Sequence, residues 1–259
     1  MLDEIVRHKQ EQIRSHGKDI METFQAAEVL PPLREFAEAL NVNGRVSLIA
    51  EAKKASPVKG RLISETRFDQ LPVLYEQNGA KAISVITEER YFEGSPFLIQ
   101  KVKSRVSLPV LRKDFIIDLR QLYETRLLGA DAVLLIAHLL PKDLPLFVET
   151  AQQLGIEPVV EVHDRYELEM ALDTPTRIIG INNRNLKDFT VDTRVCLELV
   201  GLVANKVQCI AESGIRTVED MLMLEQYGFS AALVGEALVT ATDVAAKTGE
   251  LAWYWKNEE

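Results

Sequence analysis

Charged side chains stand directly after, or inside, several short apolar runs of this chain. They are Glu51, Lys53, Lys113, Glu161 and Glu212. A buried apolar segment does not normally include such groups unless they have charged partners or a chemical task. Ammonium groups beside carboxylates can supply the acid and the base of successive proton transfers. We therefore expect acid–base chemistry, provided that the fold brings these side chains to one place.

Two glycine-containing segments near the end of the chain are typical of phosphate-binding loops. They read ESGI at 212–215 and VGEALV at 234–239. Glycine lets a backbone N–H group approach an anion closely. The expected phosphate ligands are the backbone N–H groups of Ser213, Gly214, Gly235 and Glu236, with the ammonium group of Lys53 nearby. A carboxylate beside a phosphate is unfavourable, so the Glu236 side chain is expected to point to solvent.

The segments that must position these groups repeat along the chain. Four stretches each read as the end of an amphipathic helix, then a glycine, then an apolar strand. Their glycines are Gly79, Gly129, Gly155 and Gly228, and they suit the left-handed residue that ends a helix. Strands that are apolar throughout are typical of a parallel sheet covered on both faces.

The complete pattern predicts an α/β protein with one closed barrel. Strands are expected at 46–51, 82–87, 109–114, 132–137, 158–162, 178–182, 208–213 and 231–236. Helix-like sequence separates them, with helix-start signals at Asp164 and Thr217. Eight such units predict a single (β/α)8 TIM barrel over residues 1–259. A doubly wound open sheet is the alternative, and the lack of a glycine-rich dinucleotide motif weighs against it.

The residues before the first strand are expected to form an N-terminal helical extension. It covers residues 1–45 and is broken at Pro31 and Pro32. Its apolar side chains are too many for a free tail. We expect the extension to pack near the catalytic rim of the barrel.

The polar residues of the expected strands gather at one end of the barrel. In this fold the active site lies at the C-terminal ends of the strands. The charged residues named above lie there, together with Asn182 and Arg184. Each alone has an ordinary explanation; Glu51 and Lys53, for example, could form a structural ion pair. Charges of structural origin would fall at both ends, so their one-sided placement predicts a shared pocket. His138 is interpreted as structural, and no set of residues has metal-ligand spacing.

The composition limits the classes of partner. The chain has 259 residues, 47% of them hydrophobic, with a mean hydropathy of -0.03 and a net charge of -9. This charge argues against general binding to nucleic acid or to anionic membranes. The longest apolar run, 132–137, is too short to cross a bilayer, and the first residues do not read as a signal peptide. Cys196 and Cys209 lie in apolar contexts typical of reduced core thiols, so we expect a cytoplasmic protein.

The segments at the strand ends together carry a family resemblance. In chain order they read IAEAKKASPVKG, ITEERYFEGS, LRKDF, VVEVHD, IGINNRNL, IAESGI and LVGEAL. This set resembles the indole-3-glycerol phosphate synthases of tryptophan biosynthesis over the whole chain. Related barrels share the fold and the final phosphate loops, but not AExKxxSP, LRKDF and NNRxL together. The resemblance implies a carboxy-lyase that closes a carboxyphenylamino deoxyribulose phosphate to an indole, with loss of carbon dioxide and water. It implies no cofactor and no metal.

The resemblance also implies roles for individual residues. Lys113 would be the acid of ring closure, and Lys53 with Glu51 the acid–base pair of dehydration. Glu161 would be a further proton-transfer group, and the catalytic set would also include Asn182 and Glu212. The side chains expected around the aromatic ring of the substrate are Phe92, Phe115, Leu135 and Leu233. Those expected on its hydroxyl and carboxylate groups are Ser56, Asn182 and Arg184.

Two other functions remain open. A sugar-phosphate isomerase or an aldolase could use the same barrel, with Lys113 as a Schiff-base nucleophile. That lysine would need an apolar surround to lower its pKa, whereas Glu51 and Glu161 favour the charged acid. A catalytically silent ligand-binding barrel would not need all the charged side chains. We expect a monomer that binds a phosphorylated small molecule, and weak association with other pathway enzymes is left open.

Overall fold

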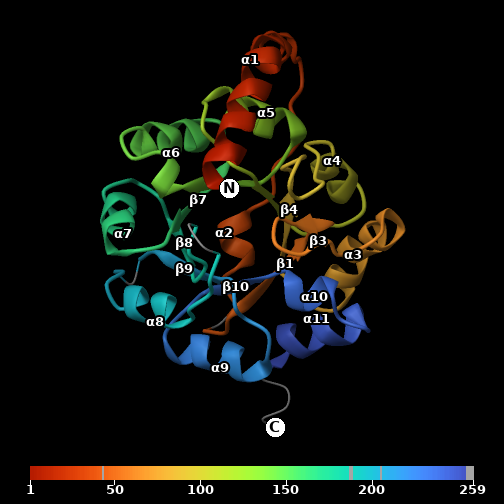
Figure 1. Ribbon diagram of the computed structural model, residues 1–259, viewed down its shortest axis with the longest axis vertical. Coiled ribbons are helices and arrows are strands. Elements are labelled where there is room, and N and C mark those ends of the chain that lie inside the picture. Colours follow the sequence, from red (N-terminus) through yellow and green to blue (C-terminus); the bar gives the residue numbers. More distant parts are fainter. Residues whose placement is uncertain (43, 187–188, 205, 255–259) are drawn as a thin grey trace.

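A closed barrel of parallel strands forms the centre of the molecule. The computed structural model describes residues 1–42, 44–186, 189–204 and 206–254. Within them, eight strands close in the order β1-β10-β9-β8-β7-β6-β5-β4 (Figure 1). Their bounds are β1 (Ser47–Ala52), β4 (Ala82–Ile86), β5 (Val110–Lys113), β6 (Ala132–Ile136), β7 (Glu157–Val162), β8 (Ile178–Asn182), β9 (Gln208–Glu212) and β10 (Ala231–Val234). The predicted strands and the (β/α)8 fold are confirmed.

Helices surround this barrel (Figure 1). Those that follow β1 in the chain are α3 (Glu65–Gln77), α4 (Leu98–Lys103), α5 (Arg120–Leu128), α6 (Leu144–Gln153), α7 (Arg165–Leu172), α8 (Arg194–Val200), α9 (Val218–Gln226), α10 (Glu236–Val239) and α11 (Val244–Ala252). A 3-10 helix, η1 (Ala137–Leu139), follows β6. A small hairpin of β2 (Ala55–Ser56) and β3 (Gly60–Arg61) follows β1, and the sequence did not predict it.

Local signals start and end these helices as expected. The side chain of Asp164 accepts a hydrogen bond from the backbone N–H of Glu167 at the start of α7. Thr217 and Asp220 form a reciprocal capping box at the start of α9. The predicted helix-ending glycines Gly79, Gly129, Gly155 and Gly228 all have positive φ, at 95°, 75°, 76° and 80°.

The segment before β1 forms two helices that lie at different ends of the barrel. α1 (Leu2–Ala26) packs on α5 (Figure 1) and brings Lys9 to Asp114, just past the C-terminal end of β5. α2 (Phe36–Ala39) is buried instead with Ala82 and Ala132, the first residues of β4 and β6. The expected position near the catalytic rim is therefore confirmed for α1 and wrong for α2, which closes the opposite end.

Side chains along each strand alternate between the barrel interior and the layer of helices outside it. This alternation produces two apolar layers and turns the charged side chains into the barrel. Successive residues of a strand point to opposite faces. Four charged site residues each follow an interior apolar residue by two positions. The pairs are Ile49 and Glu51, Leu111 and Lys113, Val159 and Glu161, and Ile210 and Glu212. The charged groups therefore continue the interior core to its C-terminal end.

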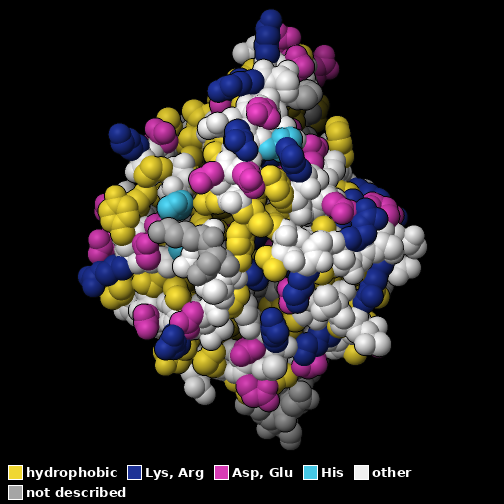
Figure 2. All heavy atoms as spheres, viewed as in Figure 1, with side chains coloured by type: hydrophobic (Ala, Val, Ile, Leu, Met, Phe, Trp, Pro, Cys, Tyr) yellow, Lys and Arg dark blue, Asp and Glu magenta, His cyan; other side chains and the backbone are white. Residues whose placement is uncertain are grey.

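The outer surface carries charges of both signs, and the two thiols lie beneath it. Basic and acidic side chains are interspersed over the face shown in Figure 2. Cys196 and Cys209 are both buried and free. No helix in the described ranges is long and apolar enough to cross a membrane.

Candidate active site

The C-terminal ends of the strands surround a cavity of about 170 Å³. Most of the predicted site residues line it: Glu51, Lys53, Phe92, Lys113, Phe115, Glu161, Asn182, Arg184, Glu212, Ser213, Gly214, Leu233, Gly235 and Glu236. The structure thus brings together side chains that are far apart in the sequence.

Two predicted substrate contacts lie elsewhere. Leu135 packs in the outer apolar layer, because β6 presents Leu134 and Ile136 to the interior. Its assignment to the aromatic pocket is wrong, and Leu134 lines the cavity instead. Ser56 belongs to the β2–β3 hairpin, where its Oγ accepts a hydrogen bond from Lys59 N at 3.2 Å. Ser56 is therefore not brought to the cavity.

Lys113 lies at the centre of the charged groups. Its Nζ is 3.0 Å from Glu161 Oε2 and 2.6 Å from Glu212 Oε2. Burial by itself lowers the pKa of Lys113, but attraction by Glu161, Glu212 and Glu51 outweighs it and raises the pKa well above the ordinary value. The ammonium form therefore dominates, which suits a proton donor and does not suit a Schiff-base nucleophile.

The two carboxylates beside Lys113 differ in their affinity for a proton. Burial raises the pKa of Glu212 to about 7, in spite of the attraction of Lys113. Burial also opposes the charge on Glu161, but Lys113 and His163 outweigh it and lower the pKa of Glu161. Asn182 Nδ2 donates a further hydrogen bond to Glu161 Oε1 at 3.1 Å. Neighbouring groups whose pKa values are pushed apart are typical of acid–base sites.

Two glycines make room for the carboxylates of the site. Lys53 Nζ forms an ion pair with Glu51 Oε1 at 2.8 Å, and this pair lies over Gly235. A β-carbon on Gly235 would lie 2.2 Å from Glu51 Oε1 and 2.9 Å from Lys53 Nζ. A β-carbon on Gly180 would lie 2.3 Å from Glu212 Oε1. The role of Gly180 was not predicted from the sequence, because it depends on a contact between neighbouring strands.

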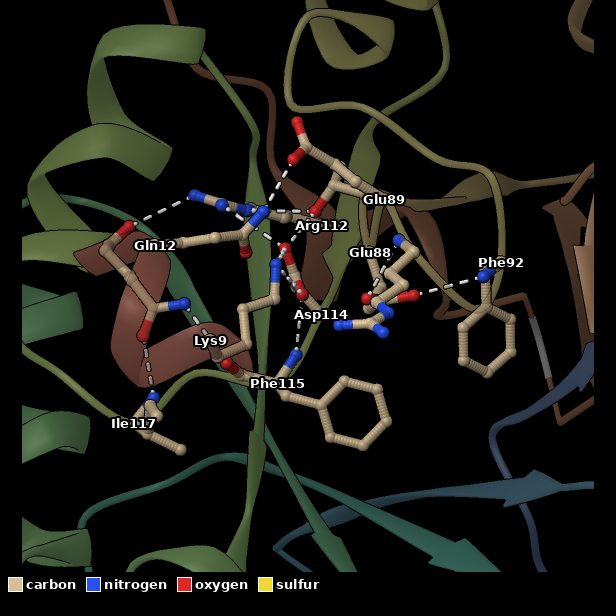
Figure 3. Close-up of polar contacts among 12 residues, drawn as sticks. Lys9, Gln12, Glu88, Glu89, Phe92, Arg112, Asp114, Phe115 and Ile117 are labelled. Carbon is tan, nitrogen blue, oxygen red and sulfur yellow. Dashed lines mark hydrogen bonds and ion pairs between the residues drawn. The ribbon is translucent and has the colours of Figure 1, made fainter. Parts of the chain in front are cut away.

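An aromatic wall closes one side of the cavity. The rings of Phe92 and Phe115 lie with centroids 6.4 Å apart. The loop that carries Phe92 is held by the buried carboxylate of Glu88, which accepts hydrogen bonds from the backbone N–H groups of Arg90, Tyr91 and Phe92 at 2.7 to 3.1 Å (Figure 3). Glu88 stands at the end of β4, so position could have indicated it, but its task is to hold a loop.

A second polar network surrounds Arg112 and Asp114 at the end of β5 (Figure 3). Asp114 is fully buried and pairs with Lys9 of α1 at 2.8 Å and with Arg112 at 3.4 Å. Thr87 Oγ1 donates to Asp114 Oδ2 at 2.6 Å. These attractions outweigh burial and lower the pKa of Asp114. The network fixes the segment that carries Lys113 and Phe115.

The loops after β9 and β10 carry backbone and cationic groups suited to an anion. Ser213 and Gly214 have positive φ, 65° and 88°. Glu236 does not point freely to solvent, because its Oε1 lies 2.8 Å from Lys59 Nζ and 3.5 Å from Arg216 Nη2. These cations lower the pKa of Glu236 and offset its charge. Sequence reasoning missed both, although Arg216 follows Gly214 by two residues.

The fold and this site define a (β/α)8-barrel enzyme of acid–base chemistry. No group of three or more His, Cys, Asp and Glu side chains in the described ranges could hold a metal ion.

Comparison with known proteins identifies the family. A family model described as indole-3-glycerol phosphate synthase matches residues 2–251. The indole-3-glycerol phosphate synthase of Desulforamulus reducens is 43% identical over 97% of this chain and 96% of its own. That of Chloroherpeton thalassium is 43% identical over 95% of this chain and 96% of its own. The chain belongs to the indole-3-glycerol phosphate synthase family.

Solved structures agree on the fold. A thiamine phosphate pyrophosphorylase from Pyrococcus furiosus has a TM-score of 0.63 at 17% identity, with 84% of this chain and 98% of that chain covered. A mutant tryptophan synthase alpha-subunit from the same organism has a TM-score of 0.60 at 14% identity, with 80% and 97% covered.

Family membership defines the activity. The enzyme is a lyase of tryptophan biosynthesis that acts on a phosphorylated small molecule. It closes 1-(2-carboxyphenylamino)-1-deoxyribulose 5-phosphate to indole-3-glycerol phosphate, with release of carbon dioxide and water.

Proposed function

We propose that Lys113 is the general acid of ring closure in this reaction. The observation that carries the proposal is the position of its ammonium group between two buried carboxylates, Glu161 and Glu212. Both keep the lysine charged and point it into the cavity. As the aryl carbon attacks the ketone, Lys113 gives its proton to the ketone oxygen, and the ring carboxylate then leaves as carbon dioxide.

Dehydration needs a second acid and a base. The ion pair of Lys53 and Glu51, 2.8 Å apart, supplies one group of each kind on the same strand end. Lys53 protonates the departing hydroxyl group, and Glu51 accepts the proton from carbon. Glu161 and Glu212 return charge and protons to Lys113, and Asn182 orients Glu161.

The remaining cavity residues position the substrate. Phe92, Phe115, Leu134 and Leu233 surround the aromatic ring. Arg184, whose Nη1 donates to Phe189 O at 3.1 Å, binds the ring carboxylate. The phosphate binds the backbone of Ser213, Gly214, Gly235 and Glu236, with Lys53 and Arg216 as counter-charges. Binding energy at the phosphate positions the reacting end.

Rapid-quench analysis of two lysine variants tests these roles. Lys113→Met should slow ring closure by about 10²–10⁴-fold with little change in KM, because it removes a proton donor used in the transition state. Lys53→Met should raise KM as well, and a decarboxylated intermediate that retains the hydroxyl group should accumulate. Ring closure at the wild-type rate in Lys113→Met would refute the assignment.

We also propose that the enzyme works as a monomer in the cytoplasm, with at most weak association with other enzymes of the pathway. The free state of the buried thiols Cys196 and Cys209 supports a reducing compartment. Sedimentation equilibrium over a range of concentrations tests the monomer.

A further inference from the structure

Alternating carboxylates and imidazoles lead from the cavity towards solvent. Glu161 Oε1 lies 3.1 Å from His163 Nε2, and His163 Nδ1 lies 2.9 Å from Glu167 Oε2. Glu167 Oε1 in turn lies 3.0 Å from Nδ1 of His138. The exposed fraction of the side chain is 3% for Glu161 and 51% for His138. The four groups therefore connect the barrel interior with the surface.

Backbone contacts fix this series in place. His163 is the first residue after β7, and its N–H group donates to Glu167 Oε2 at 2.9 Å. Glu167 stands in the first turn of α7, where Asp164 caps the helix. His138 belongs to η1, directly after β6. The carboxylate of Glu167 is thus held between two imidazole rings.

A second cavity adjoins the first on this side. Its volume is about 740 Å³, and His138, His163 and Glu167 line it. Asn182 and Arg184 line both cavities. His163 therefore has the catalytic carboxylate Glu161 on one side and a larger polar cavity on the other.

The reaction consumes one proton in each turnover. Ring closure forms a carbon–carbon bond and puts one proton on the ketone oxygen. The carboxylate then leaves as carbon dioxide and its bonding electron pair stays with the ring. Dehydration takes up a second proton with the departing hydroxyl group and releases one from carbon. Two protons enter and one is returned, so the site must regain one proton before the next cycle.

We propose that His163 supplies this proton, as a positioning residue that acts through Glu161. The proposal rests on the roles given above to Lys113 and Glu161. After Lys113 has given its proton to the substrate, His163 passes its Nε2 proton to Glu161, which passes it to Lys113. The neutral imidazole ring then rotates so that Nε2 turns towards the second cavity, takes up a proton from solvent there beside Glu167 and His138, and returns to face Glu161.

The electrostatics of the network support both halves of this cycle. Burial lowers the pKa of His163, but Glu161 and Glu167 outweigh it and raise the pKa to about 10, so the ring is charged at neutral pH. The positive charge of Lys113 lowers the pKa of Glu161. When Lys113 becomes a neutral amine that attraction is lost, and Glu161 then accepts the proton of His163.

The contact between His163 and Glu161 is close but not ideally aligned. His163 Nε2 is buried and, among the described residues, lacks a hydrogen bond of ordinary alignment, although Glu161 Oε1 is only 3.1 Å away. Buried polar atoms are normally satisfied, and the exceptions often have a functional cause. A small rotation of the ring completes the bond.

The test compares the first turnover with later ones in His163→Asn. Rapid mixing with excess substrate should give a burst of one product per active site at the wild-type rate. Later turnovers should be slower by roughly 10-fold or more, because reloading of the proton becomes rate-limiting. Imidazole added to the buffer should abolish the difference. Glu167→Gln, which does not touch Glu161, should give the same burst.

His8→Asn is the matched control, because His8 faces Glu11 on the same helix at 4.0 Å and stands outside the series. It should show no burst. An equal loss in first and later turnovers of His163→Asn, without rescue by imidazole, would overturn the proposal in favour of a purely orienting residue. Unchanged steady-state turnover would overturn it as well. A wrong assignment of Lys113 would be detected by a different measurement, because Lys113→Met would then close the ring at the wild-type rate.

Discussion

Two glycines that contact carboxylates of the site allow a test of how precisely those carboxylates must be positioned for catalysis. Gly180→Ala would place a β-carbon 2.3 Å from Glu212 Oε1, and Gly235→Ala would place one 2.2 Å from Glu51 Oε1. Ordinary contact begins at 3.4 Å, so each carboxylate must retreat by about 1 Å. A displacement of that size at a reacting group typically costs about 10²-fold in rate.

The fold should tolerate both changes. Each clash is with the end of a flexible side chain, and neither glycine has a positive φ. The cost therefore falls on the position of the carboxylate. Gly180→Ala should lower kcat by roughly 10²-fold with little change in KM. Gly235→Ala should lower kcat and also raise KM, because its β-carbon meets Lys53 beside the proposed phosphate loops.

Steady-state kinetics and thermal unfolding of three variants decide the matter. Gly201→Ala is the control, because a β-carbon there meets nothing within 4 Å. It should retain wild-type kinetics and gain slightly in Tm. If Gly180→Ala and Gly235→Ala fold normally and keep the wild-type kcat, then the positions of Glu212 and Glu51 do not matter for the chemistry and the reasoning fails.

Other predictions concern the polar network at the end of β5, the phosphate and pH. Lys9→Met should lower the free energy of unfolding by about 3–5 kcal/mol, because it leaves the buried Asp114 with one cation fewer; urea unfolding checks this, and Asp114→Asn in the same chain should restore part of the loss. Arg216→Ala should raise KM for the phosphorylated substrate but leave the weak turnover of a dephosphorylated one unchanged. Burial raises the pKa of Glu212 to about 7, so the folded state holds this proton more tightly than the unfolded state. The free energy of unfolding should therefore fall as pH rises from about 4.5 to 7, and Glu212→Gln should flatten that part of the curve. The lowered pKa of Glu161 acts only at lower pH, outside this window.

The sequence predicted features that depend on local pattern. Most barrel strands are apolar runs with a polar group at or just after their end, so both the strands and the rim could be found without a structure. Side-chain direction was predictable where a charged residue marks the inward face, as Glu161 does in β7. In β6 every residue is apolar, so the pattern could not distinguish Leu135, which faces outward, from Leu134, which faces inward.

The features that the sequence did not predict depend on contacts between distant segments. Gly180 matters because Glu212 of the neighbouring strand lies against it. Ser56 was misplaced because its charged segment forms a hairpin that no apolar alternation marks. His163 stands in the quoted motif VVEVHD, but only the structure brings it between the carboxylates of Glu161 and Glu167.

Strand β5 explains how a buried acid can be held firmly and still be free to react. Lys113 points into the barrel, whereas Arg112 and Asp114, its neighbours in the chain, take part in the polar network with Thr87 and Lys9. Inside, the lysine forms ion pairs with Glu161 and Glu212, groups that can exchange protons with it or balance its charge. In the polar network, Lys9 reaches Asp114 from α1, 105 residues away in sequence, and fixes the backbone on either side of the acid. Rigidity and reactivity are thus assigned to opposite faces of one strand, and the period-two alternation of β structure keeps them apart. The N-terminal helix consequently contributes to the position of Lys113 although it stands outside the barrel.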